Sequence, residues 1–310
     1  MKYYFTHIIG TIVMDQSLRV IEEVKFTKLD DYFSKAQTEA KLKKKYPGLI
    51  PLPEDKLPRA LEHFKDKNYF SDFYSQNVAL TRAGIRASVS KDGLILQTIG
   101  NIEELDKVCN LLVKRLREWY SLYLPELSFR MSSHDKFVEL VLKKTRAELI
   151  KEFRVVDSMG GELKERDVQE ILLLASQINN LYQLRKKQET YLELVMKEYC
   201  PNLLELAGAN IGAKLMELGR GLKALALLPA STIQLLGAEK ALFRHLKTGS
   251  RSPKYGVLYQ HQLVQKVKAS VRGKVARGLA DKLSLCARLD YFKGEFKARE
   301  FREELERKFK

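Results

Sequence analysis

The chain has 310 residues, of which 45% are hydrophobic and 30% charged, and its formal net charge is +16 at pH 7. This length accommodates two or three domains with a sizeable core, and the composition is that of a water-soluble protein. No apolar run approaches the ~18 residues of a membrane-spanning helix. Residues 1–15 lack a signal-peptide cleavage pattern and are expected to contain a strand.

The positive charge is concentrated in the last third of the chain. Residues 201–310 contain 22 Lys and Arg against 10 Asp and Glu, a balance of +12, whereas residues 1–200 contribute only +4. A basic domain joined to a nearly neutral remainder indicates a nucleic-acid partner, the alternative being an unspecific basic surface. Cys109, Cys200 and Cys286 form no CxxC pair. The sequence therefore indicates neither a zinc site nor a disulfide framework, and it favours a reducing, intracellular compartment.

Residues 1–85 are expected to form a small α/β domain. Residues 3–13 and 18–26 are runs of β-branched and aromatic residues separated by a polar turn, which predicts a hairpin. Residues 30–45 show a charged helical pattern, and the prolines that follow predict a loop over residues 47–58.

Residues 86–200 are expected to form a coiled-coil arm. Apolar residues recur at spacings of three and four over residues 95–123 and again over residues 171–195, and a proline follows each pattern. Two long helices of equal length predict an antiparallel pair, the alternative being a monomeric helical bundle. The polar seam residues Arg185 and Gln188 would weaken a two-helix core but could fix its register.

A third helix is predicted between the two halves of the arm. Ser133 is a favourable cap for a helix that runs to about residue 153, with Phe137, Leu140 and Val141 as its apolar face. The loop at residues 157–161 contains a Gly-Gly pair but not the GxGxxG pattern of a dinucleotide site.

Residues 228–246 are the segment around which we expect the basic third to be organised. Pro229 suits the first turn of a helix, because its missing N–H would be unpaired there. Gly237 permits a sharp turn, and a second short helix carrying Lys240 and Arg244 is predicted after it. A tight turn of small residues beside cations suits insertion into a polyanionic surface. The alternative is a packed helix corner with solvated charges.

The rest of the basic third is predicted to be mainly helical. In chain order, the sequence predicts a basic loop at residues 247–254, a short extended run at 256–260, a basic helix at 266–289 and a charged helix at 294–310. The last helix has an apolar stripe, Phe301, Leu305 and Phe309, which is expected to pack on a neighbouring element.

Three segments of this basic third resemble the Nop domain family. They are residues 229–246 (PASTIQLLGAEKALFRHL), 253–260 (PKYGVLYQ) and 273–292 (GKVARGLADKLSLCARLDYF). Residues 116–127 and 191–215 resemble the same family, which includes an archaeal homologue of the nucleolar Nop proteins and a spliceosomal relative. The resemblance implies an α+β, mostly α fold: a small N-terminal α/β domain, a long antiparallel coiled-coil arm and an all-helical Nop domain at residues 201–310.

The resemblance also implies a function. In the family, the N-terminal domain docks the methyltransferase fibrillarin, the arm pairs two copies into a homodimer, and the Nop domain contacts RNA. That RNA is a box C/D guide bound by a kink-turn-binding, ribosomal-protein-like subunit. The chain would be the scaffold of an archaeal, cytoplasmic ribonucleoprotein for RNA 2′-O-methylation and rRNA processing, with S-adenosylmethionine held by the partner methyltransferase and no cofactor of its own.

Three alternatives stand beside this hypothesis: a spliceosomal-type RNA-bridging scaffold without a methyltransferase, a stand-alone RNA-modifying enzyme, and a plain coiled-coil structural protein. The charge of +12 on residues 201–310 disfavours the third. The sequence contains no GxSxG, Walker A or HExxH motif and no His pair at zinc-ligand spacing, which favours binding and assembly over catalysis.

Candidate contact residues follow from the resemblance, position by position, whereas the coiled-coil residues are taken from the two patterns of three- and four-residue spacing. Those expected to contact the RNA or the kink-turn protein are Gln234, Gly237, Ala238, Glu239, Lys240, Ala241, Leu242, Phe243, Arg244, Gln260, Arg272, Lys274, Arg277 and Arg288. Those expected in the dimerisation coiled coil are Ile102, Leu105, Leu112, Leu116, Trp119, Ile171, Ile178 and Leu192. Leu242 and Phe243 fit a core position equally well.

Overall fold

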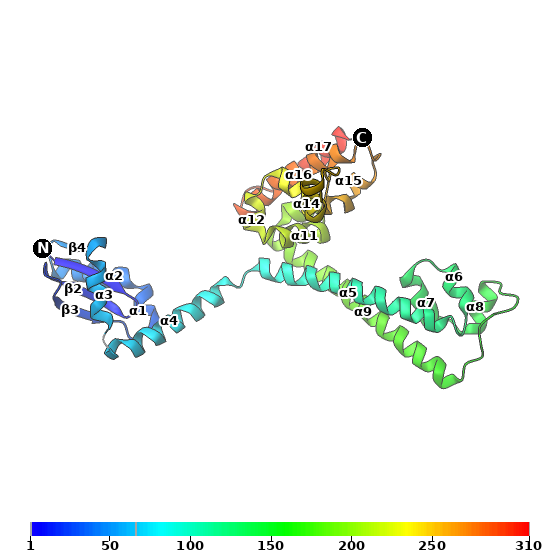
Figure 1. The fold of residues 1–310 in the computed structure, drawn as a ribbon, viewed down its shortest axis with the longest axis horizontal. Helices are drawn as coiled ribbons and strands as arrows, with labels where there is room; N and C mark the ends of the chain where they lie inside the picture. The colour runs from blue at the N-terminus through cyan, green and yellow to red at the C-terminus, as the bar shows by residue number, and fades with distance from the viewer. Residues whose placement is uncertain (1, 66, 310) are drawn as a thin grey trace. The chain divides into compact units, whose positions relative to one another are not determined.

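The computed structural model describes residues 2–65 and 67–309. It confirms the predicted fold class, because most of the chain is helical and one small sheet lies near the N-terminus (Figure 1). The chain divides into two compact units, Met1–Ser90 and Lys91–Lys310. Within the described residues, no helix combines the length and the hydropathy needed to cross a membrane.

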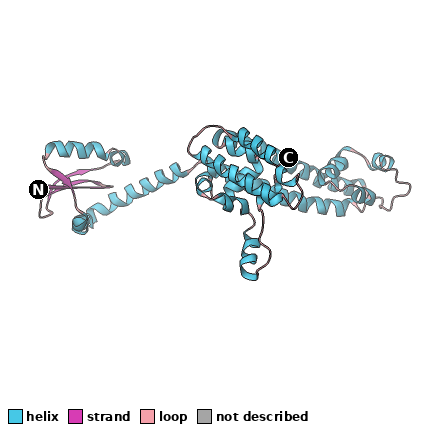
Figure 2. Cartoon of the chain, turned by 90° about the horizontal axis from the view of Figure 1, so that it is seen from above, coloured by secondary structure: helices cyan, strands magenta, loops and turns pink. Residues whose placement is uncertain are grey.

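The first unit is built on a four-stranded sheet in the order β3-β2-β1-β4. The strands are β1 (Lys2–His7), β2 (Gly10–Met14), β3 (Val20–Lys25) and β4 (Leu49–Pro51). β1 pairs antiparallel with β2 and parallel with β4, and β2 pairs antiparallel with β3. Alternate residues of β2 point to opposite faces, so Ile12 packs near Ala60 while Val13 packs near Leu42. Helices accordingly flank the sheet (Figure 2).

The predicted hairpin is wrong in its first strand. Residues 3–13 form two strands joined by a two-residue turn at Ile8 and Ile9, with His7 paired to Gly10. Both isoleucines are buried, so hydrophobic burial stabilises a turn that no polar or glycine pair marks in the sequence. The loop predicted over residues 47–58 is also wrong in part, because it contains β4.

The helical segments of this unit follow the sheet in the chain. They are α1 (Leu29–Phe33), α2 (Lys35–Lys45), η1 (Glu54–Lys56), α3 (Leu57–Glu62), η2 (His63–Lys65) and α4 (Lys67–Ser88). The helix predicted over residues 30–45 is confirmed, with one interruption at Ser34. The Ser34 hydroxyl donates a hydrogen bond to the carbonyl oxygen of Asp30, 2.7 Å away, and so competes locally with the helical pattern.

The second unit begins with the two long helices of the arm, α5 (Lys91–Tyr120) and α9 (Glu165–Tyr199). Two ion pairs show that they run antiparallel: Lys91 at the start of α5 contacts Glu198 at the end of α9, and Asp106 contacts Arg185 halfway along. The Arg185 Nε and Asp106 Oδ1 atoms are 2.8 Å apart. Arg185 thus has the register-setting position that its place in the seam suggested.

The seam itself departs from the prediction in the second half of α5. After Cys109, Leu116 is buried as predicted, but the other two buried positions are Val113 and Tyr120, each one residue later than the predicted Leu112 and Trp119. The shift occurs because α5 there shares a core with the elements between the two arm helices. These are α6 (Pro125–Arg130), α7 (His134–Lys143) and α8 (Arg146–Glu152).

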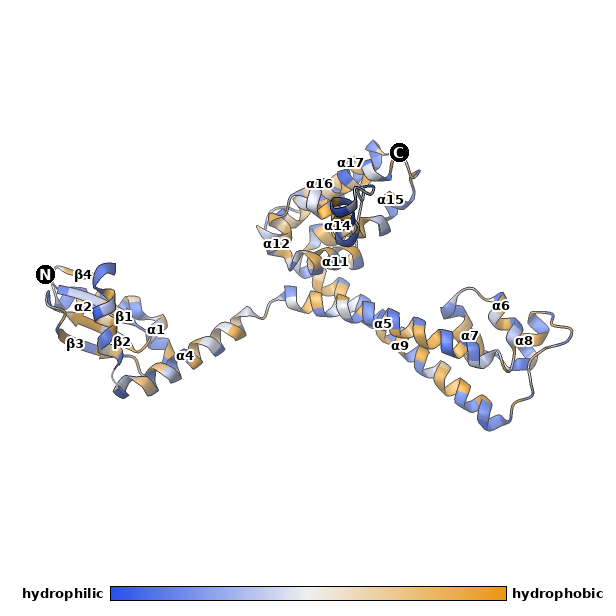
Figure 3. Ribbon diagram, in the orientation of Figure 1, coloured by the Kyte–Doolittle hydropathy of each residue, from blue (hydrophilic) through white to orange (hydrophobic). Residues whose placement is uncertain are grey.

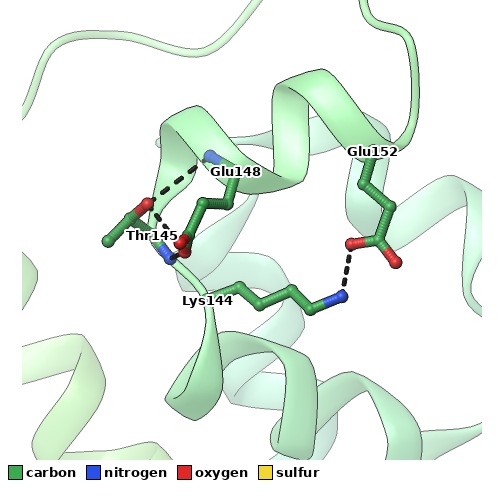
Figure 4. A network of polar contacts seen from close by, with 4 residues as sticks. All are labelled: Lys144, Thr145, Glu148 and Glu152. Atoms are coloured by element: carbon green, nitrogen blue, oxygen red, sulfur yellow. Dashed lines mark hydrogen bonds and ion pairs between the residues drawn. The ribbon is translucent and has the colours of Figure 1, made fainter.

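The single helix predicted over residues 133–153 is two helices, α7 and α8. Ser133 caps α7 as predicted, and Phe137 and Val141 are buried. The chain breaks after Lys143 because Thr145 starts a new helix with a capping box: its N–H donates to Glu148 Oε2 at 2.8 Å (Figure 4). An ion pair of 2.6 Å between Lys144 and Glu152 lies beside this cap.

The remaining helices form a bundle that shares its core with the base of the arm. They are α10 (Pro201–Ala207), α11 (Ala209–Gly219), α12 (Leu222–Leu227), α13 (Ala230–Leu235), α14 (Glu239–Thr248), η3 (Val257–Gln260), α15 (Gln262–Gln265), α16 (Arg272–Tyr291) and α17 (Ala298–Lys308). Ile95 of α5 and Leu192 of α9 belong to the same core as Leu203 and Leu279. The base of the arm and the bundle are therefore packed together.

Two predictions in this region are corrected. Residues 256–260 are a turn of 3₁₀ helix and not an extended run, and the helix predicted from residue 266 begins at Arg272. The apolar stripe of α17 is confirmed, because Leu305 is buried and Phe301 and Phe309 pack on the core.

A buried polar network joins three helices of the bundle. The Asp290 carboxylate accepts hydrogen bonds from the backbone N–H groups of Asn202 and Leu203 and from the Asn202 amide, at 2.8–3.0 Å. The Asn202 amide oxygen in turn accepts the N–H groups of Lys297 and Ala298. Asp290 thereby caps α10 from α16, and Asn202 caps α17.

Candidate nucleic-acid interface

The segment from α13 to α14 has the form predicted from the sequence. Pro229 precedes α13, Gly237 turns the chain with a φ of +86°, and α14 follows. A Cβ atom at Gly237 would lie 2.6 Å from Cγ2 of Val257, so the turn lies tightly against η3. The Glu239 carboxylate accepts the Gly237 N–H at 2.7 Å and closes the turn.

Helix α14 contains no buried residue. In Figure 2, a short helix stands away from the bundle at the horizontal position that α14 has in Figure 1. Hydrogen bonds fasten its end: the His245 ring contacts the Ser250 carbonyl, and the Thr248 hydroxyl donates to the Arg244 carbonyl.

The exposed side of α14 carries cations and apolar side chains next to each other. Lys240, Arg244 and Lys247 recur at spacings of four and three and form one stripe. None of these cations forms an ion pair within residues 2–65 and 67–309. Phe243 and Leu246, three residues apart, lie beside this stripe, and their side chains are 62% and 69% exposed, so Phe243 is not a core residue. An uncovered helix with a cationic stripe beside apolar side chains suits a partner that has both phosphates and apolar surface.

The basic residues expected on α16 do not form one group. Arg272, Lys274 and Arg277 lie in its first two turns, whereas Arg288 lies 16 residues after Arg272, about 24 Å along the helix. Arg272 is held in place by a hydrogen bond from its Nε to the Val267 carbonyl and by the ring of Tyr259 beneath its guanidinium. Arg288 donates to the Ala226 carbonyl at 3.1 Å.

The two glutamines differ in exposure. Gln234 is only 9% exposed, and its amide donates to the Lys254 carbonyl at 2.6 Å, so it orders the loop after α14. Gln260 is exposed at the end of η3. The remaining candidates of this segment, Ala238, Glu239, Ala241 and Leu242, lie at the turn or in the first turn of α14.

Most candidate dimerisation residues are buried within one copy of the arm. Ile102, Leu105, Leu116, Ile171, Ile178 and Leu192 are buried, Leu112 is half-buried and Trp119 is 37% exposed. They hold α5 and α9 together and leave little surface for a second chain. The sequence analysis missed the exposed apolar residues outside the seam, among them Leu111, Leu173, Leu184 and Leu194. On α9 the spacing of 11 between Leu173 and Leu184 is close to three helical turns and places these two on one side of the helix, a signal that the sequence already carries.

Among the titratable side chains of the bundle, His261 has a structural role. No group of three or more His, Cys, Asp or Glu side chains within the described ranges is arranged to hold a metal ion. Burial lowers the pKa of His261, whose Nε2 lies 2.9 Å from the Leu206 carbonyl and whose Nδ1 accepts the Leu263 N–H. His261 therefore serves as the cap of α15.

Comparison with known proteins identifies the family. A family model described as "Nop: snoRNA binding domain, fibrillarin" matches residues 101–310, about two thirds of the chain. The chain belongs to the Nop family. The match includes most of the arm and every helix of the bundle, so α14 and α16 lie inside the Nop region.

Relatives of several kinds are similar to this chain over most of its length. An uncharacterized NOP5 family protein of Methanocaldococcus jannaschii is 41% identical over 79% of this chain and 64% of its own length. Nucleolar protein 56 of Schizosaccharomyces pombe is 38% identical over 68% of this chain and 47% of its own length. Nucleolar protein 58 of Neosartorya fischeri is 35% identical over 79% of this chain and 42% of its own length. The chain thus spans about two fifths to two thirds of the length of these relatives.

One solved structure aligns along nearly the whole chain. It is a crystal structure of a fibrillarin/Nop5p complex, with a TM-score of 0.45 and 23% identity over 99% of this chain and 98% of that chain.

Proposed function

We propose that this chain is the non-catalytic scaffold of an archaeal box C/D ribonucleoprotein that guides RNA 2′-O-methylation. In this role it links fibrillarin to the guide RNA and to the kink-turn protein bound there. The observation that carries the proposal is the uncovered helix α14, which presents cations beside apolar side chains inside a Nop domain. The description of the matching family names snoRNA binding and fibrillarin, which supports the RNA and fibrillarin as partners.

The cations and the apolar side chains of α14 contact different partners. Lys240 and Arg244 are placed to neutralise phosphates, while Phe243 and Leu246, beside them, offer apolar area to the protein already bound to the RNA. Because each partner meets only one of these two groups, either alone binds weakly and the preassembled pair binds well. Folded RNA is recognised in this way through shape and phosphates, without a sequence-reading motif.

The arm is a long element that joins two copies of this chain. With 30 residues in α5, it is about 45 Å long. A second copy packs on exposed apolar residues of α9, among them Leu173 and Leu184, and burial of this apolar surface stabilises the homodimer. The N-terminal unit, with exposed Phe70 and Tyr74 on α4, docks fibrillarin, and catalysis with S-adenosylmethionine belongs to that partner.

The test is a gel-shift titration of a kink-turn RNA with and without its kink-turn-binding protein. We expect tight binding only to the preassembled pair, weakened at least about tenfold by Lys240→Ala or Arg244→Ala. Lys223→Ala, an exposed cation on α12, is the matched control and should bind as the wild type does. Binding that ignores both the subunit and the α14 substitutions would contradict the proposal.

A further inference from the structure

A cavity of about 660 Å³ opens beside the first half of α16. Its walls are the loop at residues 252–254, which leads from α14 to η3, and the end of α17 at Lys308 and Phe309. The volume is within the range of small-molecule sites, roughly 300–1,000 Å³. Three candidate contact residues, Gln234, Lys274 and Arg277, line it, whereas no residue of α14 does.

Two glycines of α16 shape the cavity. A Cβ atom at Gly278 would lie 3.0 Å from Cε2 of Phe309, and one at Gly273 would lie 3.4 Å from Cδ of Lys254. The absence of side chains at these positions lets the aromatic ring and the lysine stem lie directly on the helix. Phe309 is half-buried and packs on the core, so its ring is a fixed wall of the cavity.

The charges around the cavity are strongly unbalanced. Four cations line it, Lys254, Lys274, Arg277 and Lys308, against the single carboxylate of Asp281. Among the described residues none of these five groups has an ion-pair partner. Lys308 Nζ lies 5.6 Å from the centroid of the Phe309 ring, so this cation already contacts the aromatic wall. The cavity therefore combines an aromatic wall, cations without ion-pair partners and one hydrogen-bond acceptor.

We infer that this cavity binds one unstacked nucleotide of a single-stranded RNA segment, an inference that rests on the proposed RNA-binding function. The base stacks on Phe309, the flanking phosphates lie against the cations, and Asp281 accepts a hydrogen bond from a base N–H. Inorganic phosphate alone would make no stacking contact with the Phe309 ring, and the Asp281 carboxylate would repel it. The same chemistry could take a free nucleoside monophosphate, and the experiment separates the two sources.

The experiment measures binding of the full chain to a ten-nucleotide single-stranded RNA that contains 2-aminopurine. Base–aromatic stacking contributes enough that Phe309→Leu should weaken binding about 5- to 100-fold and abolish the quenching of 2-aminopurine fluorescence. Phe309→Tyr keeps the ring and should bind as the wild type does. Phe296→Leu, the same change at an exposed aromatic outside the cavity, is the matched control and should also leave binding unchanged.

A second pair of variants keeps the test valid if Phe309→Leu disturbs folding. Arg277→Gln removes an exposed cation of the cavity and should weaken the oligonucleotide at least about threefold, whereas Lys223→Gln on α12 should not. Free adenosine and uridine monophosphates should bind at least 100-fold more weakly than the oligonucleotide. Equal affinity for free nucleotide would overturn the assignment to RNA.

The outcomes separate this inference from the proposed function. If Phe309→Leu and Arg277→Gln bind the oligonucleotide as their controls do, the nucleotide cavity is wrong, even where Lys240→Ala still weakens the kink-turn complex. If the cavity variants weaken the oligonucleotide while the α14 variants leave the kink-turn complex intact, the cavity stands and the composite interface of α14 fails.

Discussion

Substitution of Gly237 by alanine tests how tightly the turn before α14 is built. The left-handed backbone at this position costs a residue with a Cβ about 1–2 kcal/mol, partly offset by the smaller unfolded-state entropy of alanine, about 0.4–1 kcal/mol. The new Cβ would also lie 2.6 Å from Cγ2 of Val257, an overpacking that costs about 1–3 kcal/mol. We therefore expect Gly237→Ala to destabilise the second unit by about 2–4 kcal/mol.

Gly249→Ala, at the other end of α14, is the matched control. Gly249 also has a positive φ, +66°, but nothing lies within 4 Å of its Cβ position, so its substitution should cost only about 1 kcal/mol. Urea unfolding measures the loss of stability in both glycine variants. It can be followed by the fluorescence of Trp119, which is the single tryptophan and lies in the second unit. Adding Val257→Ala should relieve part of the Gly237→Ala effect. Equal costs for the two glycine variants, with no relief, would refute the reasoning.

Three further predictions concern the bundle and its interface. Asp290→Ala leaves the N–H groups of Asn202 and Leu203 buried without an acceptor and should cost about 2–5 kcal/mol in urea unfolding, against about 1 kcal/mol for Asp290→Asn; equal losses would contradict the capping role. Burial lowers the pKa of His261 below its ordinary value of 6.5, so the unfolded chain binds more protons and stability falls as the pH drops through 6.5. His261→Gln should flatten the dependence of the unfolding free energy on pH between pH 7 and 5. An unchanged slope of that free energy against pH would count against the role of His261. The double variant Lys240→Ala/Arg244→Ala should lower the slope of log K against log salt for the RNA complex by about 1–2, and a wild-type slope would show that neither cation meets a phosphate.

The sequence predicted the parts of the fold that carry a periodic or conformational signal. The long arm follows from repeated spacings of three and four, and its helices show alternating hydrophobic and hydrophilic segments (Figure 3). The seam pattern placed Arg185 between the two helices but did not name Asp106 as its partner. The turn into α14 follows from Pro229 and Gly237, whose backbone preferences are local.

The parts that escaped prediction depend on contacts far along the chain. The turn at Ile8 and Ile9 is made by burial and has no turn residues. The shift from Trp119 to Tyr120 arises because α6 and α7 cover a different face of α5 than α9 alone would. Phe309 packs against Gly278 beside the cavity of α16, and no local sequence pattern predicts this contact.

Reconstituted methylation tests the central proposal most directly. A guide RNA, its target, fibrillarin with S-adenosylmethionine and the kink-turn protein would be incubated with and without this chain, and 2′-O-methylation at the guided nucleotide measured. The account predicts methylation only when this chain is present, and a strong loss with Lys240→Ala/Arg244→Ala. Equal methylation without this chain, or methylation by this chain alone, would contradict the account.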